Sequence, residues 1–216
     1  MQGFTCICGV GYKGSRFIEK REVLRMQLNG IVTGLCDPQD KIVDSYNELE
    51  RRVKAVKTLG SKVVLTSGSW DFKHIGHDRY LRLAREQGDF LVVGVESDER
   101  IRAKKGEYKP VVPQEERIES LAHLQYVNTV LIKNADDKKW HLIKTVQPDV
   151  LIISERTGYS EEDISALKEF CGSIVVIESQ AETSTSAKLR KIQIALLTKV
   201  RSKVELLLKD LEEMAS

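Results

Sequence analysis

Five short apolar runs, separated by segments with helical periodicity, constrain the fold of this chain more than any other feature. The runs are residues 62–67, 90–95, 129–132, 150–153 and 174–177. Run 90–95 is continuously apolar, as expected for a strand that is buried on both faces of a parallel sheet. The segments between the runs predict helices at about 76–87, 98–104, 113–124, 137–146 and 161–170. This alternation predicts an α/β fold, namely a Rossmann-like doubly wound parallel sheet of about five strands.

The segment before the first run predicts one further helix. Ser45, with Glu48 three residues later, has the spacing of a capping box, and Gly60 suits the C-terminal end of the helix. Apolar residues recur at helical spacing between these signals, at Leu49, Val53, Val56 and Leu59.

Composition excludes several classes of function. A chain of 216 residues with 41% hydrophobic and 31% charged residues has the length and balance of a soluble domain with extensions. The net charge of +2 gives no overall basic field that would favour nucleic acid or a membrane surface. No apolar stretch reaches the length of a membrane span or of a secretory signal. We therefore expect a cytoplasmic protein with neither nucleic acid nor membrane as a partner.

The four cysteines do not form a recognisable metal site. They are Cys6, Cys8, Cys36 and Cys171, and their spacing fits no common zinc pattern. We expect free thiols and no protein-held metal.

Residues 67–77 carry the most specific chemical signal. They read Ser-Gly-Ser-Trp-Asp-Phe-Lys-His-Ile-Gly-His and follow the first apolar run directly. Gly68 and Gly76 remove side chains where backbone must approach a ligand closely. His74 and His77 bracket the start of the next helix, where free N–H groups and the helix dipole attract anions. A strand, a small-residue turn and paired histidines therefore indicate a phosphate-handling site at the carboxyl end of the sheet.

This segment resembles the signature of the His-x-Gly-His nucleotidyltransferase superfamily. Three further segments are similar to that superfamily: residues 94–98, the cationic loop 105–117, and 184–192 with its Ser-Thr-Ser helix start. The resemblance covers about residues 41–192 and is closest to the nucleotidyltransferase half of ADP-heptose synthases. It implies transfer of AMP or CMP from ATP or CTP to a phosphorylated small molecule, expected to be a sugar or polyol phosphate, with release of pyrophosphate.

The resemblance also implies roles for individual residues. The catalytic set would be His74, His77 and Lys105. The nucleotide would contact Gly68, Ser69, Trp70, Asp71, Gly76, Ser154, Ser184, Thr185 and Ser186. The acceptor would contact Lys109, Arg117, Asp98 and Lys191. Mg²⁺ would arrive with the triphosphate.

Departures from the family pattern leave the substrates open. Lys73, Trp70 and the segments 154–159 and 180–183 differ from the residues usual in the family. An FMN adenylyltransferase and a non-catalytic nucleotide-sensing module are the alternatives. An aminoacyl-tRNA synthetase would need a Lys-Met-Ser-Lys-Ser loop, which the sequence lacks.

The two ends of the chain suggest extensions around one catalytic domain. We expect an N-terminal extension at 1–40, a nucleotidyltransferase domain at 41–192 and a C-terminal helix at 193–216. From Ser186 onward apolar residues step by three or four: Leu189, Ile192, Leu196, Val200, Val204, Leu207, Leu211 and Met214. Such a stripe either braces the domain or pairs with another chain, and we expect a homodimer.

Overall fold

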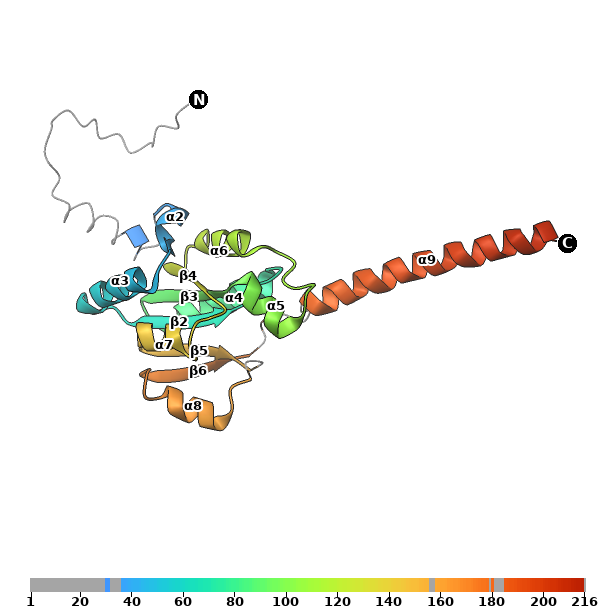
Figure 1. The fold of residues 1–216 in the computed structure, drawn as a ribbon. Helices are drawn as coiled ribbons and strands as arrows, with labels where there is room; N and C mark the ends of the chain where they lie inside the picture. Colours follow the sequence, from blue (N-terminus) through green and yellow to red (C-terminus); the bar gives the residue numbers. More distant parts are fainter. Residues whose placement is uncertain (1–29, 32–35, 156–157, 179, 181–184, 216) are drawn as a thin grey trace, which may run out of the picture.

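A computed structural model describes residues 30–31, 36–155, 158–178, 180 and 185–215 of the chain (Figure 1). In this part of the chain, six parallel strands form one sheet in the order β1-β4-β3-β2-β5-β6. The strands are β1 (Ile42–Val43), β2 (Val63–Gly68), β3 (Phe90–Glu96), β4 (Thr129–Lys133), β5 (Val150–Ser154) and β6 (Ser173–Ile177). The predicted Rossmann-like doubly wound sheet is confirmed.

The sixth strand, β1, was not predicted. It has two residues and pairs with β4 at the edge of the sheet, Ile42 with Val130 and Val43 with Leu131. Two residues are too few to show an alternation along the sequence. Their conformation is instead fixed by a partner strand that lies far away along the chain.

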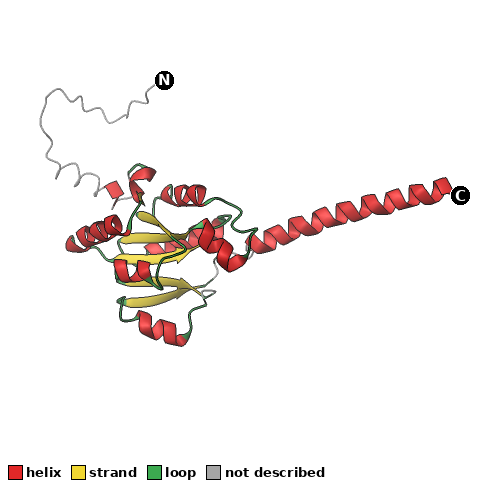
Figure 2. Ribbon diagram, viewed as in Figure 1, coloured by secondary structure: helices red, strands yellow, loops and turns green. Residues whose placement is uncertain are grey.

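Helices cover both faces of the sheet (Figure 2). One face is packed by α3 (Tyr46–Thr58), α7 (His141–Val146) and α8 (Glu161–Leu167), and the other by α4 (Ile75–Arg85) and α6 (Gln114–Ala122). Successive strand residues pack into the cores on opposite faces of the sheet, as with Leu65 on the first face and Val64 on the second. The described part of the chain also contains the helices α2 (Pro38–Lys41), α5 (Asp98–Lys105) and α9 (Thr185–Ala215).

Helix α3 agrees with its sequence signals except at its last predicted core position. The Ser45 side chain caps the helix by accepting a hydrogen bond from the Glu48 N–H, and Gly60 has a φ of +81°. Leu59, expected to face inward, is 66% exposed. Leu59 is the C-cap residue of α3, where the chain already leaves helical geometry. The helical periodicity therefore does not predict the direction of its side chain.

Two described residues at or before the expected domain start at 41 are buried in the body, namely Ile31 and Lys41. Ile31 is 4% exposed in the core under α3, and its carbonyl accepts a hydrogen bond of 2.7 Å from the Asn128 side chain. Lys41 is buried and donates to the Leu124 carbonyl at 2.9 Å. Ile31 therefore packs against the nucleotidyltransferase domain that we expect at 41–192.

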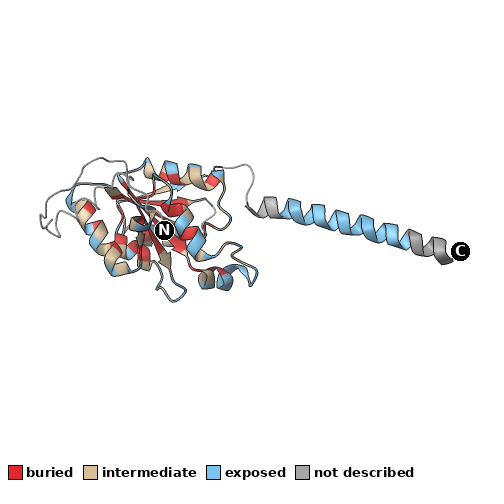
Figure 3. Cartoon of the chain, turned by 90° about the horizontal axis from the view of Figure 1, so that it is seen from above, coloured by how far each residue is buried: buried red, intermediate tan, exposed pale blue. Residues whose placement is uncertain are grey.

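Helix α9 extends away from the sheet and does not lie along it (Figure 3). Every residue from 190 to 208 is exposed. A brace across the domain, one of the two arrangements that the stripe allowed, is therefore not what the structure shows.

Candidate active site

The carboxyl ends of the central strands open into a cleft of about 760 Å³. Strand β2 lies between β3 and β5, and the chain leaves β2 toward β3 and later returns to the other side of β2 to form β5. The strand order therefore reverses beside β2, where ligands bind in open α/β sheets. The residues lining the cleft include the predicted Gly68, Ser69, Trp70, Asp71, His74, Gly76, His77, Lys105, Lys109 and Ser154.

His74 and His77 form a stacked pair at the N-terminus of α4. Their ring centroids lie 4.2 Å apart. His74 is the N-cap, and its Nδ1 accepts the Gly76 N–H at 3.1 Å, while His77 Nδ1 accepts the His74 N–H at 3.3 Å. This is a capping box built from imidazoles. It holds both rings at the positive end of the helix dipole.

The cap also decides which ring nitrogen carries a proton. A nitrogen that accepts a hydrogen bond is unprotonated, so the neutral form of each ring carries its proton on Nε2. Burial, with a smaller effect from the neighbouring His74, lowers the pKa of His77 to about 4. His77 is therefore neutral at pH 7, and its Nε2–H is a hydrogen-bond donor on the wall of the cleft.

Trp70 supports the turn between β2 and α4. Its backbone has a φ of +53°, the residue is 6% exposed, and its Nε1 donates to the Gly94 carbonyl at 2.9 Å. A Cβ on Gly68 would meet this ring at 3.2 Å, so the missing side chain makes room for the indole. The indole also meets His77 edge-on, with centroids 5.7 Å apart. Trp70 therefore both lines the cleft and positions the catalytic candidate.

The loop after α5 is tied to the β2 turn by several polar contacts. The Asp71 carboxylate accepts the Val111 and Val112 N–H groups at 3.0 Å and lies 3.6 Å from Lys109 Nζ. Lys105 Nζ donates to Ser69 Oγ at 3.1 Å. Lys105, predicted to be catalytic, and Lys109, predicted to contact the acceptor, are thus held at the edge of the cleft.

Two of the residues that were predicted to contact the acceptor do not line the cleft. Arg117 is 1% exposed, and its guanidinium donates to the carbonyls of Ser69, Glu96 (2.8 Å) and Val112 (2.9 Å) and to Asp98 Oδ1 (2.6 Å). Neither Arg117 nor Asp98 is among the residues that line the cleft. Arg117 and Asp98 are therefore not placed to contact an acceptor in the cleft, as had been expected. Arg117 instead joins the turn after β2, the end of β3 and the loop before α6.

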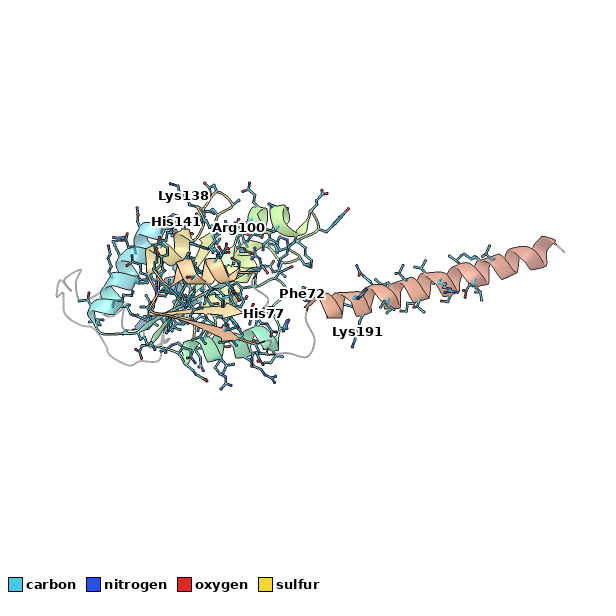
Figure 4. The ribbon with its side chains drawn as sticks, turned by 90° about the horizontal axis from the view of Figure 1, so that it is seen from below. Phe72, His77, Arg100, Lys138, His141 and Lys191 are labelled. Atoms are coloured by element: carbon cyan, nitrogen blue, oxygen red, sulfur yellow. The ribbon has the colours of Figure 1, made fainter. Side chains whose placement is uncertain are left out.

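The Ser-Thr-Ser segment lies at the edge of the described part of the chain, and Lys191 is not among the residues that line the cleft. Ser184 lies outside the described residues. Thr185 and Ser186 form the start of α9, but their side chains lie outside the description. Lys191 is exposed on α9, apart from His77, Arg100, Lys138 and His141 (Figure 4).

A cluster of charges that was not among the predicted site residues lines the cleft at the ends of β3 and β4. The Glu96 carboxylate lies 3.6 Å from Arg100 Nε and forms a hydrogen bond with Lys104, while the Lys133 ammonium donates to Ser67 Oγ at 3.2 Å. Arg100 Nε makes no hydrogen bond although it is buried. Burial lowers the pKa of Lys133 to about 8, and Glu96 partly opposes that shift. Glu96 and Lys133 are each the last residue of a strand, which is the signal that could have found them.

The loop between β4 and α7 adds a second unpredicted group. The rings of Tyr46 and His141 stack with centroids 4.0 Å apart, and the Tyr46 hydroxyl donates to Asp137. All three residues line the cleft. Burial and the Asp137 hydrogen bond raise the pKa of Tyr46 far above its usual value, so the hydroxyl keeps its proton.

No group of three or more His, Cys, Asp or Glu side chains in the described part of the chain could hold a metal ion. None of the helices found there has the length and apolar character needed to cross a bilayer.

Comparison with known proteins adds a family and several relatives. The sequence model of the cytidylyltransferase-like family matches residues 65–204. The chain is 38% identical over 154 residues to the bifunctional protein HldE of Cronobacter sakazakii, covering 70% of this chain and 32% of that protein. It is 34% identical over 171 residues to HldE of Shigella sonnei, covering 78% and 35%. The chain thus spans about a third of the length of these relatives.

One solved structure shares the fold over its entire length. It is a lipopolysaccharide core biosynthesis protein from Thermoplasma volcanium, with a TM-score of 0.51 and 25% identity. The likeness covers 56% of this chain and 100% of the other.

Proposed function

Because the chain belongs to the cytidylyltransferase-like family, we propose that it transfers a nucleoside monophosphate from ATP or CTP to a phosphorylated sugar or polyol and releases pyrophosphate. The stacked histidine pair carries this proposal. Both Nδ1 atoms accept backbone N–H groups, so the Nε2 atoms hold the protons that can bind phosphate oxygens.

The reaction is an in-line attack by an acceptor phosphate oxygen on the α-phosphorus. The bond from that oxygen to phosphorus forms as the bond to the bridging oxygen breaks, and pyrophosphate leaves with the electron pair. The protein has only to position the reactants and stabilise the charge. His77 donates its Nε2–H to the α-phosphoryl oxygen or the bridging oxygen, and Lys105 and Lys109 hold the outer phosphates.

Mg²⁺ belongs with the nucleotide in this proposal. The Asp71 carboxylate is engaged by two backbone N–H groups and Lys109, and the described residues contain no cluster of three ligands. The ion would therefore be held mainly by phosphate oxygens and water, as is common for Mg²⁺ at triphosphates. When bound, it neutralises charge on the leaving pyrophosphate.

The charges at the ends of β3 and β4 are our candidates for binding the acceptor phosphate. Lys133, Arg100 and Lys104 surround the carboxylate of Glu96, so these four side chains together carry two more positive than negative charges. The Nε of Arg100, which makes no hydrogen bond, adds a buried hydrogen-bond donor. This wall lies on one side of the histidines, and Ser154 at the end of β5 lies on the other. The nucleotide would then lie over β2 and β5, and the acceptor over β3 and β4.

Pyrophosphate release tests the proposal directly. The purified protein is incubated with each of the four nucleoside triphosphates against a panel of sugar phosphates, polyol phosphates, phosphocholine-type acceptors and FMN. We expect release with ATP or CTP that depends on one sugar or polyol phosphate. His77→Ala should abolish most of it, while His123→Ala, at an exposed histidine outside the cleft, should leave it unchanged. No release with any pair would refute the function, and release with FMN alone would assign the acceptor to the flavins.

A further inference from the structure

Helix α9 carries an exposed row of apolar side chains. We define the apolar stripe as Ile192, Leu196, Val200, Val204 and Leu207, which step by three or four residues and are 48–60% exposed. Steps of three and four place side chains on one face of a helix. The stripe therefore forms a continuous apolar face that nothing in the described part of the chain covers.

Such a helix needs a partner. Helices in proteins gain most of their stability from packing an apolar face rather than from intrinsic helix propensity. α9 has 31 residues, and those from 190 to 208 are all exposed. A continuous apolar face of this kind marks an interaction surface.

The charges of α9 are divided between its two halves. Residues 185–204 contain six basic residues and no acidic one: Lys188, Arg190, Lys191, Lys199, Arg201 and Lys203. Residues 205–215 contain four acidic residues and one basic one: Glu205, Asp210, Glu212, Glu213 and Lys209. A helix with this polarity is complementary in charge to a second copy that runs in the opposite direction.

The apolar pattern is nearly symmetric about Val200. Leu196 and Val204 lie four residues to either side of it, and Ile192 and Leu208 lie eight residues to either side. Outside the apolar centre, Arg190 and Asp210 lie ten residues to either side, and Lys188 and Glu212 lie twelve. Reversing the helix about Val200 therefore superposes these apolar positions on one another and sets Arg190 and Lys188 against Asp210 and Glu212, although Lys191 falls on Lys209.

We propose that α9 pairs antiparallel with α9 of a second copy of this chain, with the two-fold axis close to Val200. A two-fold axis makes the same patch serve both copies, which requires a self-complementary surface. Parallel pairing would set six basic residues against six and acidic ends against each other, which is unfavourable. An anionic membrane surface is a poorer match, because the last eleven residues of the helix are net acidic.

The mass in solution tests whether the stripe makes a dimer. Light scattering after size exclusion should give twice the chain mass of 24.5 kDa. Val200→Asp places a charge in the centre of the stripe and should give a monomer. Thr198→Asp adds the same charge two residues away, off the stripe, and should leave the dimer. Far-ultraviolet circular dichroism shows that the body of each variant is folded. A wild-type monomer, or a dimer that survives Val200→Asp, would overturn the proposal.

Cysteine cross-linking tests the orientation. The four native cysteines are first replaced by serine, and Ile192→Cys and Leu208→Cys are made separately in this background with different affinity tags. Antiparallel pairing brings residue 192 of one copy beside residue 208 of the other. Oxidation of the mixed variants should therefore yield the 192–208 product, with little 192–192 product from Ile192→Cys alone. A dominant 192–192 product would show a parallel pair and contradict the antiparallel arrangement.

Discussion

Replacing Arg117 should cost stability rather than acceptor binding alone. The side chain is fully buried and donates to three carbonyl oxygens and to Asp98, whose own side chain is 21% exposed. Arg117→Met keeps the bulk but leaves these acceptors without a donor. Removing one partner of a buried charged pair costs roughly 3–5 kcal/mol. Because Asp98 retains some contact with water, we expect about 3 kcal/mol, near the lower end of that range.

The assay is thermal unfolding followed by circular dichroism. For a chain of this size 1 kcal/mol shifts the midpoint by roughly 2–4 °C, so Arg117→Met should lower Tm by about 6–12 °C. Arg82→Met is the matched control, because Arg82 is 62% exposed and its ion pair with Glu86 spans 3.5 Å on the surface. Such a pair contributes less than about 1 kcal/mol. Arg117→Lys keeps the charge and should fall between wild type and Arg117→Met.

Enzyme kinetics below the melting range completes the test. Arg117 holds the backbone of both Ser69 and Glu96, so its loss should change the KM of nucleotide and acceptor by similar factors. An unchanged Tm together with a higher KM for the acceptor alone would refute the reasoning. It would restore Arg117 as a direct acceptor ligand.

Two further predictions concern Lys133, at the end of β4, and Gly94, within β3. The pKa of Lys133 is lowered to about 8, so its charge is present below that pH and lost above it. The kcat/KM for the acceptor should therefore fall above about pH 8. Lys133→Arg should shift that fall to higher pH, with both enzymes measured at the same pH values so that substrate ionisation cancels. Identical pH profiles of wild type and Lys133→Arg would contradict this role. Gly94→Ala should destabilise the protein by roughly 1–3 kcal/mol in urea unfolding, because the new Cβ would meet Leu142 Cδ2 at 2.4 Å. A urea midpoint equal to that of wild type would contradict this prediction, because it would show that Leu142 moves aside at no cost.

The sequence predicted those features that depend on local patterns. The strands and the Ser45 cap follow from periodicity and spacing within a few residues. The position of His74 and His77 at a helix start follows from the strand and helix on either side. The carboxyl-end location of the site then follows from the parallel topology.

Features that depend on distant partners were not predictable in this way. Arg117 is buried because backbone carbonyls from three separate segments converge on it, and a charged residue gives no sequence signal for that. β1 exists because β4 pairs with it. For α9, the same stripe would occur in a brace and in an intermolecular helix, and the structure shows only that α9 is not a brace.

The central claim is that the Nε2–H of His77 stabilises the transferring phosphoryl group, and two substitutions isolate it. Asn can place an oxygen near the Nδ1 position and keep the cap, whereas Gln can place an N–H near Nε2. Steady-state pyrophosphate release should show kcat reduced by about 10²–10³ in His77→Asn, the usual cost of one transition-state donor, with part of that loss recovered in His77→Gln. A His77→Asn enzyme that is folded and turns over at close to the wild-type rate would contradict the account.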